Sequence, residues 1–150
     1  MLRAFRVVWA SLIWLFVIMV PIQFYLAGHG AMEGAHAADK KITPMKTGWD
    51  PHIAFGTIMV LVALLVLLAA LASRPTRRLL GMSAGLFVFM IIQFVLPFFN
   101  DSAGTRWIAA LHGVNALIVT GLAIGLLIRT RPYWPFAKPS AQVAAGGAAP

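Results

Sequence analysis

Residues 107–128 read WIAALHGVNALIVTGLAIGLLI, a run of 22 residues that contains no Asp, Glu, Lys or Arg. About 20 residues of helix cross the hydrocarbon core of a bilayer, because each residue rises about 1.5 Å and the core is about 30 Å thick. The run is therefore long enough to span a membrane. It nevertheless holds His112 and Asn115, and polar side chains within a span are costly unless they have partners.

Three further uncharged windows of similar length precede this run. The sequence thus predicts helices over about 7–28, 51–73, 79–100 and 106–128, since irregular backbone exposed to lipid would leave its polar groups unpaired. Composition agrees, because 61% of the 150 residues are hydrophobic and 11% are charged, against about 25% charged in soluble domains. We expect an all-α, integral membrane four-helix bundle over residues 1–130.

The distribution of charge predicts how the bundle is oriented. If the N-terminus is cytoplasmic, eight basic residues face the cytoplasm and four face outward, which satisfies the positive-inside rule. We therefore expect an N-in, C-in protein of the inner (cytoplasmic) membrane, with all four histidines toward the outer side. The net charge of +8 then reflects topology, and no nucleic-acid partner is expected. The cytoplasmic set is Arg3, Arg6, Arg74, Arg77, Arg78, Arg129, Arg131 and Lys138, and the outer set is Lys40, Lys41, Lys46 and Arg106.

Residues 131–150 differ in composition from the helices. They begin with the interfacial sequence RPYW and continue into Pro, Ala and Gly, which cannot bury enough apolar surface to order a chain. We expect a disordered cytoplasmic tail.

An internal repeat relates the two halves of the bundle. LFVIMVPIQFYL (residues 15–26) aligns with LFVFMIIQFVL (residues 86–96) if one gap is allowed near Pro21. The second and fourth helices then correspond, and each has a His near its outer end. Equivalent helices run in the same direction, so this is a parallel tandem repeat of two helices. It pairs Gln23 with Gln93, and His52 with His112.

The polar residues of the spans form a layer in the outer leaflet. Counted from the inner charges, Gln23, Gln93 and His112 lie about 22 to 26 Å from the cytoplasmic boundary, whereas His52 lies about 33 Å from it unless tilt or stagger compensates. One interpretation is structural, with these groups and Asn115 hydrogen-bonded across helices. For His112 we favour a function, because an amide would serve a purely structural bond without a titrating ring.

Two neutral imidazoles on helices related by a two-fold axis suit the two axial positions of a haem iron. We therefore expect His52 and His112 to ligate one haem b near the outer face. Gln23, Gln93 and Asn115 would surround the ligands with hydrogen bonds.

Three further residues complete the expected haem site. Gly56 and Gly113 would leave room for the macrocycle beside their helices, and Arg106 on the outer side would receive a propionate.

This pattern resembles one half of haem A synthase and, more loosely, other cytochrome b-type four-helix membrane proteins. It also resembles small uncharacterised four-helix membrane proteins of actinobacteria. The resemblance covers residues 7–128 and implies that His52 and His112 are the axial ligands. Haem A synthase has two such halves, whereas this chain has one. The family also has a carboxylate shortly before the His of the second helix; this carboxylate is not matched in place here, and Asp50 is the nearest candidate. Haem-modifying oxidation is therefore not expected, and no catalytic residue is assigned.

The expected role is electron transfer or haem handling. One haem near one face does not carry electrons across a membrane, so a quinone or a membrane redox complex is the expected partner, in a homo- or hetero-oligomer.

Other interpretations stay open. The protein is alternatively a cofactor-free accessory or assembly subunit of a larger respiratory or photosynthetic complex, or a subunit whose His binds a chlorophyll-type pigment. His29, Met32 and His36, with Glu33, form a weaker candidate for copper in the first outer loop. The chain has no Cys, so Cys-ligated metal is excluded.

Overall fold

The structure, a computed structural model, describes residues 2–39, 49–100 and 104–134. These residues form helices and contain no strand, so the predicted all-α four-helix fold is confirmed. The elements are α1 (Leu2–Asp39), α2 (Trp49–Ser73), α3 (Arg77–Val95), the 3-10 helix η2 (Leu96–Asn100), α4 (Arg106–Arg129) and the 3-10 helix η3 (Arg131–Tyr133).

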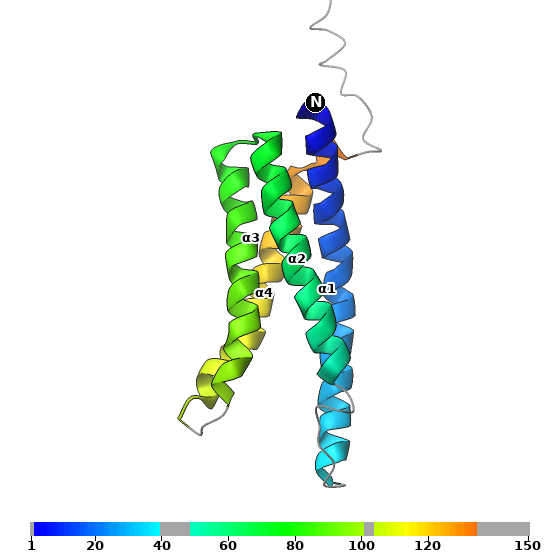
Figure 1. Cartoon of the computed structure of the whole chain (residues 1–150), viewed down its shortest axis with the longest axis vertical. Coiled ribbons are helices and arrows are strands. Elements are labelled where there is room, and N and C mark those ends of the chain that lie inside the picture. Colours follow the sequence, from blue (N-terminus) through cyan, green and yellow to red (C-terminus); the bar gives the residue numbers. More distant parts are fainter. Residues whose placement is uncertain (1, 40–48, 101–103, 135–150) are drawn as a thin grey trace, which may run out of the picture.

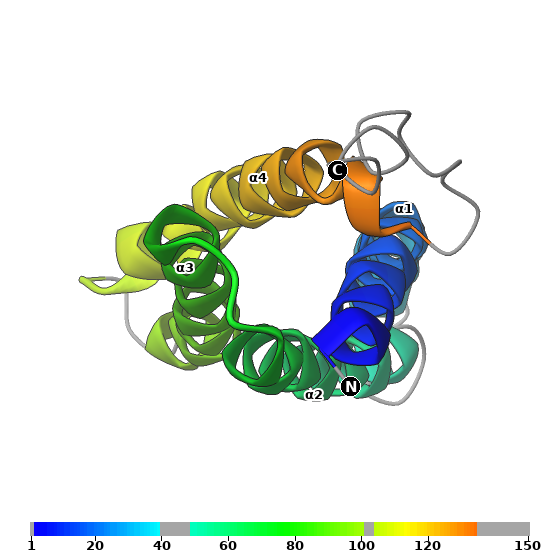
Figure 2. The ribbon, with the colours of Figure 1, turned by 90° about the horizontal axis from the view of Figure 1, so that it is seen from above.

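The four long helices alternate in direction and form a closed ring in which α1 contacts α2 and α4, and α3 contacts α2 and α4 (Figures 1 and 2). The N-terminus and η3 share one end of the bundle, which we call the terminal end. His52 and His112 lie toward the opposite end, the histidine end. There the pair α1/α2 diverges from the pair α3/α4 (Figure 1).

Large side chains fill the bundle toward the terminal end. Trp9, Ile13, Phe16, Val66 and Leu86 are fully buried. The outward faces are also apolar, which would be unfavourable in water and is typical of helices that face lipid. The exposed set on α2 alone includes Ile53, Ile58, Leu61, Leu65, Leu68 and Leu71.

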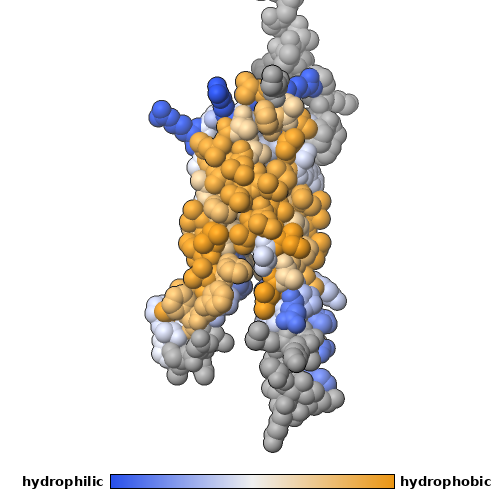
Figure 3. All heavy atoms as spheres, viewed as in Figure 1, coloured by the Kyte–Doolittle hydropathy of each residue, from blue (hydrophilic) through white to orange (hydrophobic). Residues whose placement is uncertain are grey.

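Each of the four helices is long and apolar enough to cross a membrane. Figure 3 shows the resulting hydrophobic surface along the bundle, with hydrophilic groups concentrated near its two ends. The chain is therefore a multi-pass membrane protein.

Several helix boundaries differ from the prediction, and three of them concern the histidine end. Residues 29–39, predicted as a loop, continue α1, because this Ala-rich segment contains good helix formers and no Pro. Helix α2 begins at Trp49, two residues before its predicted start. Helix α3 ends at Val95 and continues as η2, because Pro97 has no N–H to donate to the carbonyl oxygen four residues earlier and its ring crowds that carbonyl.

The start of the predicted tail is ordered and belongs to the bundle. Arg6 donates to the carbonyl oxygen of Ser73 (3.4 Å), and its guanidinium lies 5.3 Å from the centre of the Tyr133 ring. The Tyr133 ring in turn lies 6.3 Å from that of Trp9, between centroids. The predicted boundary at residue 130 is therefore wrong for residues 131–134, and the prediction for 135–150 lies outside the described residues.

Candidate functional site

A cavity of about 580 Å³ lies between the diverging helix pairs at the histidine end. All four long helices and η2 contribute to its wall, which is mostly apolar. Its few polar side chains include Gln23, His52, Gln93 and His112. Figure 3 shows the cleft that separates the two halves of the molecule at this end.

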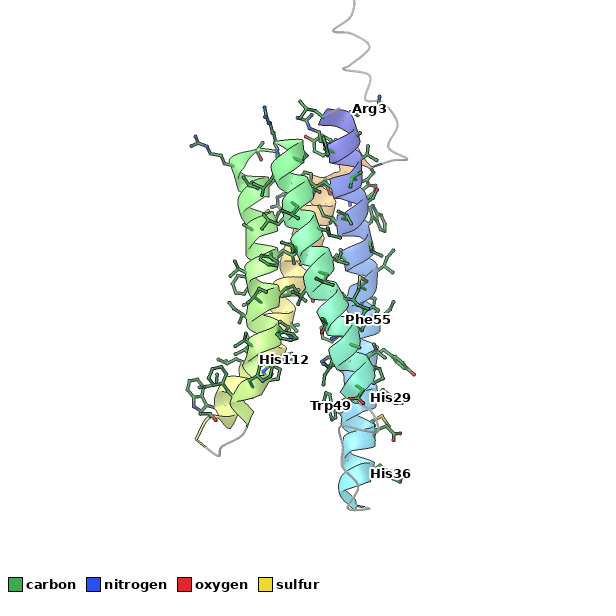
Figure 4. The ribbon with its side chains drawn as sticks, viewed as in Figure 1. Arg3, His29, His36, Trp49, Phe55 and His112 are labelled. Carbon is green, nitrogen blue, oxygen red and sulfur yellow. The ribbon has the colours of Figure 1, made fainter. Side chains whose placement is uncertain are left out.

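The two histidines of the predicted pair meet in this cavity. The centres of their rings are 6.1 Å apart, and the ring planes are inclined by 63°. Residue counting placed His52 closer to the outer surface than His112. The rings nevertheless meet, in a bundle whose helices α2 and α4 are inclined to one another (Figure 1). His112 lies on the face of the α3/α4 pair that is turned toward α1 and α2 (Figure 4).

A hydrogen-bond network fixes the orientation of His112. Its Nδ1 lies 3.0 Å from the carbonyl oxygen of Gln93. A carbonyl oxygen only accepts, so Nδ1 carries the proton and Nε2 keeps a free lone pair. This carbonyl is available because residue 97, which would donate to it in a continuing α-helix, is a proline without an N–H.

Asn115 extends the network one turn further along α4. It is buried, and its Nδ2 donates to the side-chain oxygen of Gln93 (2.6 Å) and to the carbonyl oxygen of Phe89 (2.9 Å). The backbone of Gln93 thus accepts from His112, while its side chain accepts from Asn115. The predicted hydrogen bonding of Gln93, His112 and Asn115 across helices is confirmed.

A different contact joins α1 to α2. Gln23 Nε2 donates to the backbone carbonyl oxygen of His52 at 3.1 Å, so Gln23 also bonds across helices as predicted. Gly56 permits this approach, because a Cβ at Gly56 would lie 2.9 Å from Gln23 Nε2. Within the described part of the chain, the buried atoms His52 Nδ1 and Gln23 Oε1 have no hydrogen-bond partner.

The remaining predicted residues have different outcomes. Gly113 lines the cavity, and a Cβ there would meet no atom within 4 Å. The prediction for the side chain of Arg106 lies outside what the structure describes.

The suggested copper ligands do not come together in a loop. His29, Met32 and His36 are exposed on α1 (Figure 4), and two helical turns separate the two histidines by about 10 Å along the axis. No cluster of three or more His, Cys, Asp or Glu suited to a metal ion occurs among the described residues.

Sequence reasoning missed two contributors to the site. Trp49 packs its ring against that of His52, with centroids 5.7 Å apart. Pro97 exposes the carbonyl that binds His112. Pro97 lies four residues after Gln93, so the sequence indicates that the Gln93 carbonyl oxygen lacks its helical donor. Only the fold shows that the side chain that reaches this oxygen is His112.

Comparison with known proteins gives one match. No curated protein and no solved structure matches the chain. A family model described as a family of unknown function, DUF6220, matches residues 23–103, just over half of the chain. The matched segment includes Gln23, His52 and Gln93 and ends before His112. The chain therefore belongs to the DUF6220 family.

Proposed function

We propose that this protein binds one haem b in the cavity at the histidine end, with His52 and His112 as the axial ligands. The observation that carries the proposal is the meeting of two imidazoles from opposite sides of one apolar cavity, with ring centres 6.1 Å apart. The role is electron transfer or haem handling, in keeping with the resemblance to one half of haem A synthase.

The ring separation fits bis-histidine ligation. A metal bonds to an imidazole nitrogen at about 2.0 Å, and each nitrogen lies about 1 Å from the centre of its ring, so two axial rings have centres about 6 Å apart. The hydrogen bond from His112 Nδ1 to the Gln93 carbonyl leaves Nε2 for the metal. Ligating histidines in proteins are characteristically held by such a bond from the second nitrogen.

The cavity also fits a flat, largely apolar cofactor. Its volume of about 580 Å³ falls within the range of roughly 300 to 1,000 Å³ common for cofactor sites. Phe24, Phe94 and Phe98 line it, and neither Gly56 nor Gly113 places a side chain in it. A bound haem would supply one-electron exchange; the residues named here would hold it and exclude water.

The charge distribution supports an orientation. The terminal end carries Arg3, Arg74, Arg77 and Arg78, so the positive-inside rule assigns this end to the cytoplasm. In this proposal the protein lies in the inner membrane with both termini cytoplasmic, and the haem lies near the extracytoplasmic face. A quinone or a membrane redox complex is the partner that completes the electron path.

An absorption spectrum tests the proposal. The full chain is purified in detergent, supplied with haem, and measured oxidised and after reduction with dithionite. We expect a sharp reduced α-band that disappears in both His52→Ala and His112→Ala. The matched controls are His29→Ala and His36→Ala, which remove exposed imidazoles of α1 and should keep the band.

Two results would contradict the proposal. A correctly folded wild-type protein that takes up no haem favours the cofactor-free accessory subunit. An α-band that survives the removal of both His52 and His112 places the haem elsewhere. Folding of each variant is checked by far-ultraviolet circular dichroism and gel filtration.

A further inference from the structure

Positive charge gathers at the terminal end of the bundle without negative charge to balance it. The segments that form this end are the start of α1, the junction of α2 and α3, and the end of α4 with η3. All of them carry arginine, and none contains an acidic residue. The four acidic residues of the chain are Glu33, Asp39, Asp50 and Asp101.

The arginines of this end fall into two groups. Arg6 donates to a backbone carbonyl oxygen of α2, Arg129 donates to one of its own helix (3.0 Å), and the guanidinium of Arg131 lies 5.9 Å from the centre of an aromatic ring. In the described part of the chain, the guanidinium groups of the other four have no hydrogen bond, ion pair or ring contact. These four, which we call the arginine patch, are Arg3, Arg74, Arg77 and Arg78.

The members of the arginine patch lie near one another and are all exposed. Three of them fall within residues 74–78, at the junction of α2 and α3. Arg3 precedes Arg6 by three residues and therefore shares its face of α1, and Arg6 reaches the carbonyl oxygen of Ser73. Figure 4 shows Arg3 at the terminal end, where Figure 1 also shows the junction of α2 and α3.

The backbone at Arg74 does not explain why an arginine stands there. Its φ is 49°, in the left-handed region where helices commonly end with Gly, because Gly has no Cβ to crowd the chain. The chain thus carries a cation at a position for which the helix end alone favours Gly.

Exposed apolar side chains border the arginine patch. Leu2, Phe5 and Leu71 are 49%, 44% and 53% exposed, and each lies within three residues of a member of the patch. In a bilayer such side chains face acyl chains. The surface therefore matches a ligand that joins an anionic group to hydrocarbon, whereas a free anion would use only its charged part.

We propose that the arginine patch binds the headgroup of an anionic phospholipid, with the acyl chains against the bordering apolar side chains. A guanidinium donates two parallel hydrogen bonds to a phosphate, and clusters of basic residues beside membrane-spanning helices attract anionic lipids. The lipid supplies the negative charge that this end of the protein lacks. This inference goes beyond the proposed haem site and does not depend on it.

Native mass spectrometry of the full chain tests the proposal. The protein is purified in a neutral detergent and titrated with phosphatidylglycerol, or with phosphatidylcholine that has the same acyl chains. The Kd of each lipid is obtained from the fraction of protein that carries it. We expect phosphatidylglycerol to bind more tightly by about 5-fold or more, the effect of one basic residue near an anionic membrane surface.

A triple variant, Arg74→Gly/Arg77→Gln/Arg78→Gln, removes most of the patch. Gly suits the φ of residue 74, and Gln has nearly the helix propensity of Arg, so the variant should fold. Its affinity for phosphatidylglycerol should fall about 5-fold for each arginine removed, and so about 100-fold in all.

The matched control removes the same charge from another part of the chain. Lys40→Gln/Lys41→Gln/Lys46→Gln has the same net charge as the triple variant and an intact patch. Its affinity should stay within about 2-fold of the wild type, because exposed charges act over only about 10 Å in salt. The single change Arg3→Gln, on a different helix, should lower the affinity about 5-fold.

Three results would overturn the proposal. The first is equal affinity of the wild type for the two lipids, and the second is phosphatidylglycerol binding that both the triple variant and Arg3→Gln retain. The third is displacement of the lipid by inorganic phosphate, compared with sodium chloride at the same ionic strength, which would assign the patch to a free anion. If circular dichroism shows that the triple variant does not fold, Arg3→Gln decides.

Discussion

Substitution of Gly56 by Ala provides the sharpest test of the packing at the histidine end. A Cβ at this position would lie 2.9 Å from Gln23 Nε2, so the carboxamide must move and its 3.1 Å bond to the His52 carbonyl is lost. Interhelical hydrogen bonds in membrane proteins contribute about 0.6 kcal/mol on average and up to about 1.7 kcal/mol. Against this, Ala is favoured over Gly in a helix by about 1 kcal/mol.

The two effects nearly cancel in the single variant, so a double-mutant cycle with Gln23→Ala is required. When Gln23 is already Ala, no carboxamide opposes the new methyl group, and Gly56→Ala should stabilise the protein by about 1 kcal/mol. In the wild-type background the same change should be less favourable by about 0.6 to 1.7 kcal/mol. This difference is the coupling energy of the pair.

The cycle is measured by equilibrium unfolding in mixed micelles with a rising fraction of sodium dodecyl sulfate, followed by far-ultraviolet circular dichroism. Gly121→Ala is the matched control, because a Cβ there would meet no atom within 4 Å. The free energy of unfolding of this variant should increase only by the difference in helix propensity between Ala and Gly. A coupling energy below about 0.5 kcal/mol, the scatter of independent sites, would refute the proposed link between Gly56 and Gln23.

Three further changes have defined outcomes. Gly113→Leu places a side chain in open cavity space, so its thermal unfolding temperature should equal or exceed that of the wild type while haem uptake, measured by absorbance, is lost; an unchanged haem spectrum would contradict the assigned cavity. Asn115→Leu should lower the free energy of unfolding by about 1 to 3 kcal/mol, because the side-chain oxygen of Gln93 loses its partner; a loss below 0.5 kcal/mol, on the order of a neutral substitution, would argue against this bond. A chain that ends at Thr130 lacks the ring packed on Trp9 and should unfold more easily by about 0.5 to 1.5 kcal/mol or more; equal stability in the same micelle assay would show that this segment does not hold the bundle together.

The sequence predicted those parts of the fold that depend on the bilayer. Absence of charge over about 20 residues is a direct consequence of the hydrocarbon core, so each span was located to within a few residues. The extension of α1 to Asp39 leaves no such signal, because a helix that continues past the core follows ordinary propensities. The change from α3 to η2 was not predicted, because a Pro within a span is compatible with either a kink or a helix end.

The candidate site was predicted in its residues but not in its geometry. Counting residues along straight helices separated His52 from His112 in depth, because the count contains no information on helix tilt or stagger. The rings nevertheless meet. The bond from His112 to the Gln93 carbonyl oxygen also depends on tertiary contacts, which bring this side chain to that carbonyl.

The pairing of Pro97 with the Gln93 carbonyl has a consequence for which substitutions this site tolerates. His112 is oriented by a backbone atom, so a change of the Gln93 side chain leaves the acceptor in place. The sensitive position is Pro97, where another amino acid would restore an N–H able to compete for the same carbonyl. The tautomer of the His112 imidazole therefore depends on a residue fifteen positions earlier in the chain. Because Pro97 has no N–H, the Gln93 carbonyl oxygen remains available to His112 Nδ1.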